Sequence, residues 1–324
     1  MIFHSPNGHG AALGVGLKPL KRVVPRRLSP LGVAIGQYRP RRLTVPARYL
    51  RTRPPERAPT VSIVTPTYNQ GRYVTRTLES VLSQRYPKLE YIVIDGGSED
   101  GAVEALERYR GRLHHLESRP DDGPASAINE GFARSSGEIM AWLNSDDVLL
   151  PGSLAYVARY FAEHPEVDLV YGHRVLVDDE DRDIGIWVTP RHCPDSLLWY
   201  DFVPQETAFW RRRIWDRVGG IDESFMIAFD WDFFSRLHRS GARIMRLPRF
   251  LGAYRQHPNQ LTRVRRKTAL QEHAAIRERW NGRPLTRDEI RAGVFPFLVR
   301  SLPYLAGYGA IARLPGRVEV ALPR

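Results

Sequence analysis

Apolar runs and amphipathic segments follow one another along the first half of the chain. Residues 61–67 (VSIVTPT) form a β-branched run that predicts a buried strand, and residues 72–84 repeat apolar side chains at helical spacing. The same alternation predicts further strands at 89–96, 112–118 and 138–144, and helices at 101–110 and 126–134. A succession of strands and helices predicts a parallel sheet covered on both faces, so the expected fold class is α/β.

Polar and small residues gather directly after each predicted strand. These clusters are TPTYN at 65–69, DGGSED at 95–100, RPDDGP at 119–124 and NSDD at 144–147. Ligands of open α/β sheets bind beyond the carboxyl ends of the strands, so the four clusters predict one binding site. No GxGxxG or GxxxxGK[ST] motif follows the first strand, which excludes the usual dinucleotide and P-loop phosphate cradles.

The segment LNSDD at 143–147 ends the fourth predicted strand with two adjacent carboxylates. Asp146 and Asp147 repel each other when both are ionised, and a hard divalent cation shared with substrate phosphates relieves that repulsion. A turn or a helix N-cap before Pro151 explains an isolated Asp-Asp pair equally well. The position after a strand favours the metal site.

Two further acidic segments carry candidate residues. Asp95 is followed by two glycines that let the backbone turn sharply, so it either accepts hydrogen bonds from a nucleoside or closes a simple turn. In DWDFF, we expect Asp232 to cap a helix and Asp230 to face a cleft. Burial beside aromatic residues would raise the pKa of Asp230 into the range of a general base.

His257 lies in the polar segment YRQHPNQLT at 254–262. A lone loop histidine is usually solvated, but near Asp146 a neutral imidazole is suited to complete a metal shell or to contact a diphosphate. Arg255 either adds a positive charge to that phosphate site or is a solvated surface arginine.

The net charge of +12 is concentrated at the two ends of the 324-residue chain. Residues 1–59 carry 12 Lys or Arg against one acid, and residues 251–324 carry 14 against 5, whereas residues 60–250 are acidic overall. Basic ends favour an anionic membrane surface as a partner over nucleic acid, because the basic residues are not interleaved with aromatic ones. The single cysteine, Cys193, excludes an internal disulfide and fits a reducing compartment.

No segment has the pattern of a signal peptide or of a spanning helix. The most apolar segment, 294–311, contains Arg300 and two prolines, so we expect it either to lie on a lipid surface or to pack against the rest of the protein. The candidate interfacial side chains are Phe295, Phe297, Leu298, Tyr304 and Tyr308. The expected location is the cytoplasm or, peripherally, the inner face of the plasma membrane.

Six motifs in order resemble the family 2 glycosyltransferases, which have a GT-A fold. They are VSIVTPTYNQ, YIVIDGGSEDG, DDGPASAINEGFARSSGEIMAWLNSDD, VPQETAFWRRRIWDRVGG, DWDFFSRL and YRQH. The resemblance implies a Rossmann-like, mostly parallel sheet and an inverting transfer of a sugar from a nucleoside-diphosphate sugar. It also implies Mn²⁺ or Mg²⁺ as a cofactor, a glycan or lipid-linked glycan acceptor, and a role in cell-surface polysaccharide or glycan synthesis.

The same resemblance implies roles for individual positions. The residues expected to bind the nucleoside are Thr65, Pro66, Tyr68, Asn69 and Asp95. The residues expected at the metal and diphosphate are Asp146 and His257 as ligands, with Asp147 and Arg255 beside them. The residues expected at the acceptor are Asp230 as catalytic base and Glu206 and Trp231 as contacts. An ion pair with the arginines at 211–213 would explain Glu206 equally well.

Two positions depart from the pattern of the family. Asn144 replaces the first acid of the DxD triplet, and Ser126 stands where related sequences often have Asp. The first departure keeps open the hypothesis of a nucleotide-sugar binding module without catalysis. A sugar-phosphate nucleotidyltransferase is the remaining alternative, although TPTYNQGRY lacks the Gly-rich basic loop of that class.

The predicted organisation has three parts. They are a basic, Arg/Pro-rich N-terminal arm at 1–59, a GT-A domain at 60–262 with a nucleotide-binding half at 60–150 and an acceptor half at 151–262, and a helical C-terminal extension at 263–324 that is a candidate for membrane association.

Overall fold

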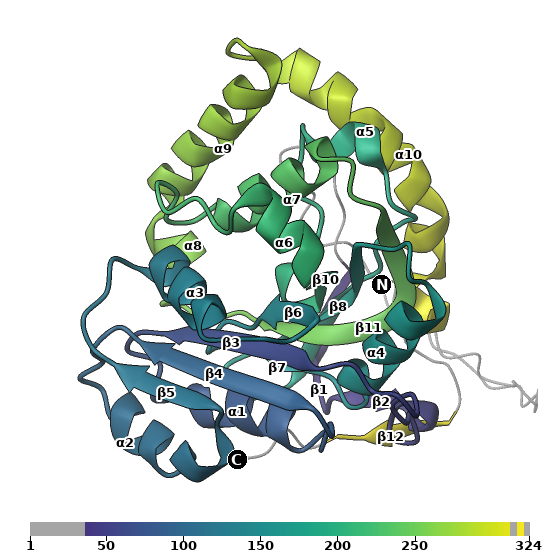
Figure 1. Cartoon of the computed structure of the whole chain (residues 1–324). Coiled ribbons are helices and arrows are strands. Elements are labelled where there is room, and N and C mark those ends of the chain that lie inside the picture. Colours follow the sequence, from purple (N-terminus) through teal and green to yellow (C-terminus); the bar gives the residue numbers. More distant parts are fainter. Residues whose placement is uncertain (1–35, 312–315, 321–324) are drawn as a thin grey trace, which may run out of the picture.

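The computed structural model describes residues 36–311 and 316–320 of the chain (Figure 1). Within these residues, ten strands form one sheet in the order β1-β9-β8-β10-β6-β3-β4-β5, with β11 also paired to β8 and β7 paired to β11. The strands of this sheet are β1 (Gly36–Arg41), β3 (Val61–Thr67), β4 (Leu89–Asp95), β5 (His115–Ser118), β6 (Ile139–Trp142), β7 (Val148–Leu149), β8 (Leu169–Val177), β9 (Asp183–Trp187), β10 (Phe209–Arg211) and β11 (Ile244–Arg255). The helices are α1 (Val74–Leu82), α2 (Ala102–Glu107), α3 (Pro124–Ala133), α4 (Ser153–Glu163), α5 (Pro194–Leu197), α6 (Arg212–Val218), α7 (Phe229–Arg239), α8 (Leu261–Val264), α9 (Arg266–Asn281) and α10 (Arg287–Ile311).

The mostly parallel central sheet confirms the predicted α/β class. Strands β5, β4, β3 and β6 are parallel neighbours, as are β8 and β11, while β10 runs antiparallel between β6 and β8. Helices α1 and α2 lie on one side of this sheet and α3 on the other (Figure 1). The strands and helices predicted between residues 61 and 144 are all present, with boundaries shifted by a few residues.

An aromatic cluster joins the sheet to α7. The indole of Trp142 on β6 lies 5.1 Å from that of Trp210 on β10, and stacks on Phe234 of α7 at 6.2 Å between ring centroids. Phe233 packs edge-on against Trp210 at 5.1 Å. Because these side chains are buried, they fix α7 over the sheet, and with it the candidate base Asp230 in the first turn of that helix.

Residues 36–59 of the expected N-terminal arm belong to the folded domain. Strand β1 pairs antiparallel with β9 at the edge of the sheet, and the hydroxyl of Tyr38 donates to the buried carboxylate of Asp183. Strand β2 (Thr44–Pro46) pairs with β12 (Arg317–Glu319) near the other end of the chain. Residues 1–35 lie outside the described part of the chain.

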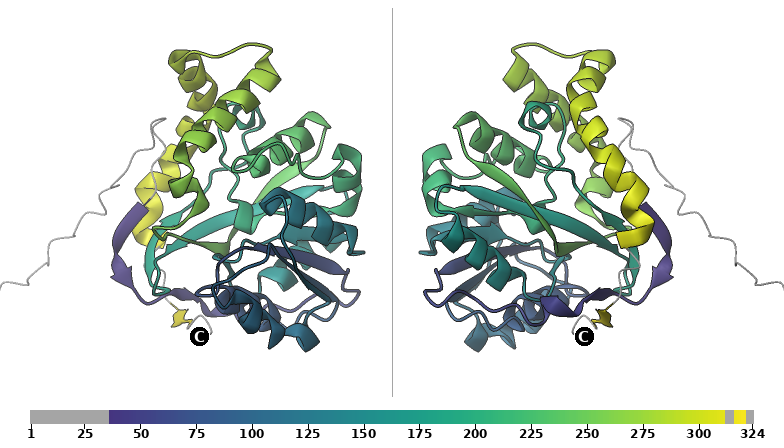
Figure 2. Two further views of the ribbon diagram at one scale, coloured as in Figure 1. Left: turned by 90° about the vertical axis from the view of Figure 1, so that its left-hand side faces the viewer. Right: turned by 90° about the vertical axis from the view of Figure 1, so that its right-hand side faces the viewer.

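Helices α9 and α10 meet at the end of the molecule farthest from α1 and α2, and α10 runs from there back toward β11 (Figure 1 and Figure 2). In the described residues, no helix combines the length and the apolar character that crossing a bilayer requires. Of the expected interfacial side chains, Phe297 is fully buried, Leu298 packs against the core, and the Tyr304 hydroxyl accepts a hydrogen bond from Arg246. Only Phe295 is exposed, at 62 %, and the Tyr308 side chain lies outside the described residues.

Candidate functional site

The carboxyl ends of β3, β4 and β6 bring three of the predicted clusters to one edge of the sheet. Thr67 at the end of β3 pairs with Asp95 at the end of β4, and the N–H of Leu143 after β6 donates to the carbonyl of Val64 at 2.8 Å. We call this edge the donor edge, after the sugar donor that the resemblance of the motifs implies. The clusters TPTYN, DGGSED and LNSDD therefore lie together, as the sequence predicts.

Asp95 shapes the loop that follows β4. Its fully buried carboxylate accepts hydrogen bonds from the N–H groups of Gly97 (3.1 Å) and Ser98 (2.9 Å) and from the hydroxyls of Ser98 (2.5 Å) and Ser118 (2.7 Å). Most of its acceptor capacity is thus used inside the protein. The simple turn, one of the two alternatives for this residue, is present, and its expected contact with the nucleoside stays a prediction.

The TPTYN segment divides into a buried and an exposed part. Thr65 and Pro66 lie within the fully buried strand β3, and the Thr65 hydroxyl is 3.0 Å from that of Tyr91. Asn69 has a positive φ of 52° and accepts a hydrogen bond from the Glu99 N–H at 2.9 Å. Tyr68 is 62 % exposed, so its ring is the free surface of this segment.

Asp121 is a donor-edge residue that the sequence pattern does not single out. A side chain at Gly96 would meet the Asp121 carboxylate at 3.1 Å, so this acid faces the loop after β4 at close range. Burial and neighbouring acids raise the pKa of Asp121, while the Gly123 N–H opposes that shift. The one sequence signal for Asp121 is its place in the RPDDGP cluster after the third predicted strand.

Asp146 and His257 meet at the donor edge, as predicted for a metal pair. The Asp146 Oδ2 lies 3.0 Å from the His257 Nε2, although 111 residues separate them in the chain. The His257 side chain is 2 % exposed and the Asp146 side chain 18 %, and the Tyr73 ring packs against the imidazole at 4.7 Å. A partly open carboxylate beside a buried imidazole is a suitable pair of ligands for a divalent cation.

Asp147 points away from Asp146 and into the protein. Its side chain is 1 % exposed, and its Oδ1 accepts a hydrogen bond from the backbone N–H of Arg255 at 2.9 Å. Burial and the charge of Asp146 raise the pKa of Asp147, which favours its uncharged form. The expected repulsion between two ionised carboxylates is therefore reduced inside the protein, because Asp147 is buried and anchors the backbone of β11.

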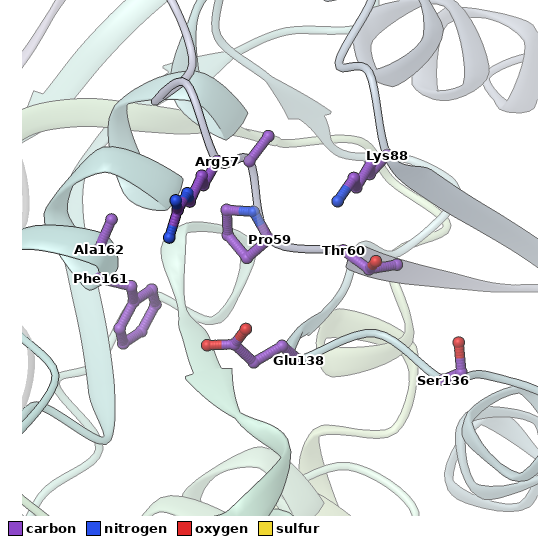
Figure 3. A pocket seen from close by; sticks show the side chains of 9 residues that line it. Arg57, Pro59, Thr60, Lys88, Ser136, Glu138, Phe161 and Ala162 are labelled. Carbon is purple, nitrogen blue, oxygen red and sulfur yellow. The ribbon is translucent and has the colours of Figure 1, made fainter.

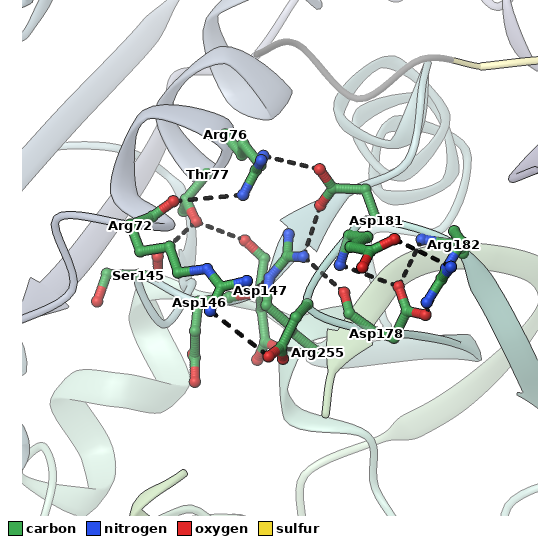
Figure 4. Close-up of polar contacts among 12 residues, drawn as sticks. Arg72, Arg76, Thr77, Ser145, Asp146, Asp147, Asp178, Asp181, Arg182 and Arg255 are labelled. Atoms are coloured by element: carbon green, nitrogen blue, oxygen red, sulfur yellow. Dashed lines mark hydrogen bonds and ion pairs between the residues drawn. The ribbon is translucent and has the colours of Figure 1, made fainter. Parts of the chain in front are cut away.

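Arg255 is buried between the LNSDD turn and the β8–β9 loop (Figure 4). Its guanidinium donates to the carbonyls of Asp146 (2.8 Å) and Asp178 (2.9 Å) and pairs with Asp181 at 2.5 Å. A side chain with 0 % exposure is not a solvated surface arginine, and its Nε and Nη1 bind groups of the protein, while its buried Nη2 has no hydrogen-bond partner among the described residues. Arg255 therefore fixes the position of Asp146.

Asn144, which replaces the first acid of the triplet, is hydrogen-bonded to Gln205 in the segment before β10. Its side-chain amide donates to the Gln205 Oε1 at 3.2 Å, and the Gln205 amide in turn donates to the carbonyl of Trp142 at 2.8 Å. An amide at this position therefore links β6 to the segment that precedes Glu206.

Glu206 forms a buried ion pair, but with a partner other than the expected one. The Arg174 Nε donates to its Oε1 at 2.8 Å, and the Arg174 Nη2 contacts its Oε2. The arginines at 211 and 213 pair with Glu138 and Asp168 instead. The Tyr254 ring lies 4.5 Å from the Arg174 guanidinium, so this pair is a rigid part of the site.

Asp230 is half-buried in the first turn of α7. Its Oδ1 accepts a hydrogen bond from the Trp231 N–H at 2.8 Å. Burial raises the pKa of Asp230 to about 6, against the opposing charge of Arg174. The carboxylate is therefore ionised at neutral pH yet basic enough to accept a proton, which fits the predicted general base.

Asp201 is a second acid of this region, and no sequence pattern marks it. Burial, followed by the charge of Asp230, raises its pKa well above the usual range. The Asp201 Oδ1 is buried without a hydrogen-bond partner among the described residues. Asp201 is therefore the neutral neighbour of Asp230.

Trp231 packs in the core rather than at a surface. It has 0 % exposure, and its indole N–H donates to the Leu197 carbonyl at 2.7 Å. This placement does not fit the expected acceptor contact, because neither the ring nor its polar atom is free.

Glu272 of α9 holds the loop that leads into α7. Its carboxylate accepts three backbone hydrogen bonds, from the N–H groups of Met226 (2.8 Å), Ile227 (2.9 Å) and Ala228 (2.8 Å). A carboxylate at the N-terminal end of a helix is electrostatically favourable. The C-terminal extension thus positions the segment that carries Asp230, a role for which the sequence holds no local signal.

The residues at the donor edge fit a divalent cation bound together with a ligand. Among the residues the structure describes, no group of three or more His, Cys, Asp or Glu side chains is arranged to hold a metal ion by itself. Asp146 and His257 supply two ligands, and Mg²⁺ typically completes its shell with substrate phosphates and water. The site therefore suits an ion that arrives with a phosphorylated substrate.

A separate cavity of about 440 Å³ lies away from the donor edge (Figure 3). It is lined by residues at the opposite ends of the central strands, including Thr60, Lys88 and Glu138. None of the predicted site residues lines it, so it takes no part in the chemistry of the donor edge.

The raised pKa of Asp230 predicts a pH-dependent cost to stability. The folded state retains the proton up to about pH 6, whereas the unfolded state releases it near pH 4, so stability falls as the pH rises through this window. Asp230→Asn should therefore stabilise the protein against urea by about 1–3 kcal/mol at pH 7.5 and by much less at pH 4. Asp216→Asn, at an exposed position of α6, is the matched control and should change neither value. Equal effects of Asp230→Asn at both pH values would contradict the assignment.

The sequence matches a family model and a set of bacterial relatives. The model for glycosyl transferase family 2 covers residues 62–220. An uncharacterised glycosyltransferase of Mycobacterium tuberculosis is 32 % identical over 185 residues, which are 55 % of this chain and 69 % of the relative. A PGL/p-HBAD biosynthesis glycosyltransferase of the same species is 28 % identical over 193 residues, 58 % of this chain and 73 % of the relative.

Solved structures share the fold. The Staphylococcus aureus TarS fragment 1–349 in complex with UDP-GlcNAc has a TM-score of 0.56 at 19 % identity, covering 79 % of this chain and 76 % of that one. The mannosyltransferase PcManGT of Pyrobaculum calidifontis, in complex with GDP-Man and Mn²⁺, has a TM-score of 0.56 at 22 % identity, covering 83 % and 82 %. The GT-A fold expected from the motifs is thereby confirmed. Motif order, relatives and fold agree, and the chain is a glycosyltransferase that belongs to glycosyl transferase family 2.

Proposed function

We propose that this glycosyltransferase moves a sugar from a nucleoside-diphosphate sugar to a hydroxyl group, with inversion at the anomeric carbon. The observation that carries the proposal is Asp230, a half-buried carboxylate whose pKa is raised to about 6 and which α7 holds near the Glu206–Arg174 pair. An inverting displacement needs one such base and no second protein nucleophile.

Asp230 accepts the proton of the acceptor hydroxyl as that oxygen attacks the anomeric carbon. The attack comes from the face opposite the bond to the diphosphate, so one carbon–oxygen bond forms while the other breaks and the nucleoside diphosphate leaves. The neutral Asp201 beside Asp230 leaves the negative charge on Asp230, where it attracts the proton.

A divalent ion held by Asp146, His257 and the donor diphosphate would neutralise the negative charge that develops on the leaving group. The protein's own contribution is to orient these two ligands. Arg255 fixes the carbonyl of Asp146 and Asp147 fixes the N–H of Arg255, so the Asp146 carboxylate keeps its direction toward His257.

The donor edge supplies surfaces for a nucleoside. The exposed ring of Tyr68 is suited to stack on a base, and Asp121 is suited to accept a hydrogen bond from a base or a ribose. The loops after β3 and β4 would take their shape from four residues that need not touch the nucleoside, namely Thr65, Pro66, Asn69 and Asp95. UDP-GlcNAc and GDP-Man, bound in the two structural neighbours, define the class of donor to test.

Glycan synthesis at the cell surface is the role that the relatives favour. They include the PGL/p-HBAD enzyme and an O-antigen biosynthesis protein of Myxococcus xanthus, which is 31 % identical over 194 residues, 58 % of this chain and 15 % of that protein. The acceptor we propose is a glycan or a lipid-linked glycan at the inner face of the plasma membrane. Family membership sets aside the nucleotidyltransferase alternative.

Asp230→Asn should lower kcat by about 10²- to 10⁴-fold while binding of UDP or GDP with Mn²⁺ stays unchanged. In the wild type, kcat should fall about tenfold per pH unit below about pH 6, because the protonated carboxyl cannot accept a proton. Turnover of UDP- and GDP-sugars across pH 5–8 measures both. A variant with wild-type kcat would exclude Asp230 as the base, and nucleotide binding without turnover in the wild type would support the non-catalytic module.

Asp146→Asn should remove the Mn²⁺ dependence of UDP or GDP binding, because a carboxamide is a poor ligand for a hard cation. Calorimetric affinities with Mn²⁺ and with EDTA should then coincide in the variant and differ by at least about tenfold in the wild type. Asp147→Asn is the matched control, since its amide oxygen can still accept the Arg255 N–H and the metal dependence should persist. Loss of metal dependence in the Asp147 variant alone would reverse the two assignments.

Glu272→Ala should lower kcat about tenfold with little change in nucleotide affinity, because it frees the three N–H groups that hold the segment before α7. Glu278→Ala changes an exposed acid on the same helix and should leave kcat unaltered. If both variants lose the same activity, the effect of Glu272 comes from general weakening of α9.

A further inference from the structure

The segment from residue 261 to 271 presents apolar and cationic side chains together on the surface. It contains α8 and the first turns of α9, and we call it the α8–α9 corner. Leu261, Val264 and Leu270 are 43 %, 65 % and 61 % exposed. The cations of the corner, all exposed, are Arg263, Arg265, Arg266 and Lys267, and residues 261–271 include no acid.

The positive charge of the α8–α9 corner is uncompensated. Among the described residues, none of its four cations forms an ion pair, and the one side-chain contact is a hydrogen bond from the Arg263 Nη1 to the His257 carbonyl at 3.3 Å. Two nearby arginines differ, since Arg283 before α10 pairs with Glu289 and Arg291 on α10 pairs with Asp288. The corner thus holds a local excess of four positive charges.

Helical spacing brings the apolar and cationic side chains of the corner to shared faces. Leu261 and Val264 are three residues apart in α8, and Leu270 follows Arg266 and Lys267 by four and three residues in α9. Long basic side chains beside exposed aliphatic ones are typical of helices that lie in the headgroup region of an anionic bilayer. Nucleic acid is a poorer match, because the corner has no aromatic side chain for a base to stack on.

The α8–α9 corner adjoins both parts of the candidate active site. It begins four residues after His257, to which Arg263 is bonded, and it leads directly into Glu272, which holds the segment before Asp230. A surface that docked on the corner would therefore lie close to both the donor edge and the base.

We propose that the α8–α9 corner docks on an anionic bilayer, with its three aliphatic side chains in the headgroup region and its cations on the lipid phosphates. This inference rests on the proposed function where it assigns the docked enzyme an acceptor held at the membrane. The proposed membrane contact is residues 261–271 and not the segment 294–311 expected from the sequence. In that segment, Phe297 is buried and Tyr304 is hydrogen-bonded to Arg246.

Binding of the full chain to vesicles measures the contribution of the cations. The wild type should bind phosphatidylcholine vesicles that contain phosphatidylglycerol and should bind pure phosphatidylcholine weakly. The triple variant Arg265→Gln, Arg266→Gln, Lys267→Gln should bind the anionic vesicles roughly a hundredfold more weakly, since each cation near such a surface contributes about a fivefold factor. It keeps Arg263, so UDP or GDP binding with Mn²⁺ should not change.

A fluorescent label reports on the corner itself. Cys193 is buried, so Leu270→Cys provides one accessible thiol for an environment-sensitive dye. The dye on residue 270 should shift to the blue on anionic vesicles. The dye on the matched control Leu302→Cys, which is 60 % exposed on α10, should not.

Two outcomes would overturn the proposal: equal vesicle binding by the wild type and the triple Gln variant, or no spectral shift at residue 270, whether or not residue 302 shifts. If a short RNA duplex displaced the protein from the vesicles and bound it with the same affinity, the partner of the corner would be nucleic acid rather than a bilayer. Turnover of a soluble donor and acceptor tests the proposed function separately, because the corner variants should retain it. Absent turnover with intact vesicle binding would contradict the enzyme mechanism and leave the docking surface standing.

Discussion

The donor edge depends on the burial of one guanidinium, that of Arg255. A fully buried charge is costly unless it is paired and hydrogen-bonded, and here Asp181 and the carbonyls of Asp146 and Asp178 supply partners for the Nε and Nη1 of Arg255, whereas its buried Nη2 has no hydrogen-bond partner among the described residues. These bonds draw three separate segments together, namely the LNSDD turn, the end of β11 and the β8–β9 loop. The direction of the Asp146 carboxylate toward His257 follows from this arrangement.

The position of the proposed base, Asp230, likewise depends on segments that are distant in the sequence. The aromatic cluster packs α7, which carries Asp230, against the sheet. Glu272 of α9 binds the backbone of the segment before α7. Helix α9 therefore helps to position the segment that carries Asp230. The packing of α7 sets the position of Asp230. The same packing buries its carboxylate, and this burial raises the pKa of Asp230.

The sequence predicts the elements from β3 to β6, because apolar periodicity is a local property. The proximity of Asp146 and His257 is predicted only through the resemblance to a known family. The sequence does not predict which way the side chains face. Asp147 and Arg255 lie next to the proposed metal ligands, yet their side chains are buried inside the protein. Glu272 lies 46 residues from the Met226 N–H that it binds, and no pattern within α9 reveals that contact. Long-range hydrogen bonds and burial are decided by tertiary packing, which a single sequence does not contain.

The proposed mechanism depends most on Asp146 and His257 as the protein's half of a metal site at the donor edge. Anomalous diffraction at the manganese edge, from crystals grown with Mn²⁺ and UDP or GDP, tests this pair most directly. We predict one strong peak about 2.2 Å from both the Asp146 Oδ2 and the His257 Nε2, with the diphosphate completing the shell. A nucleotide bound at the donor edge with the manganese elsewhere, or with no manganese at all, would contradict the metal site.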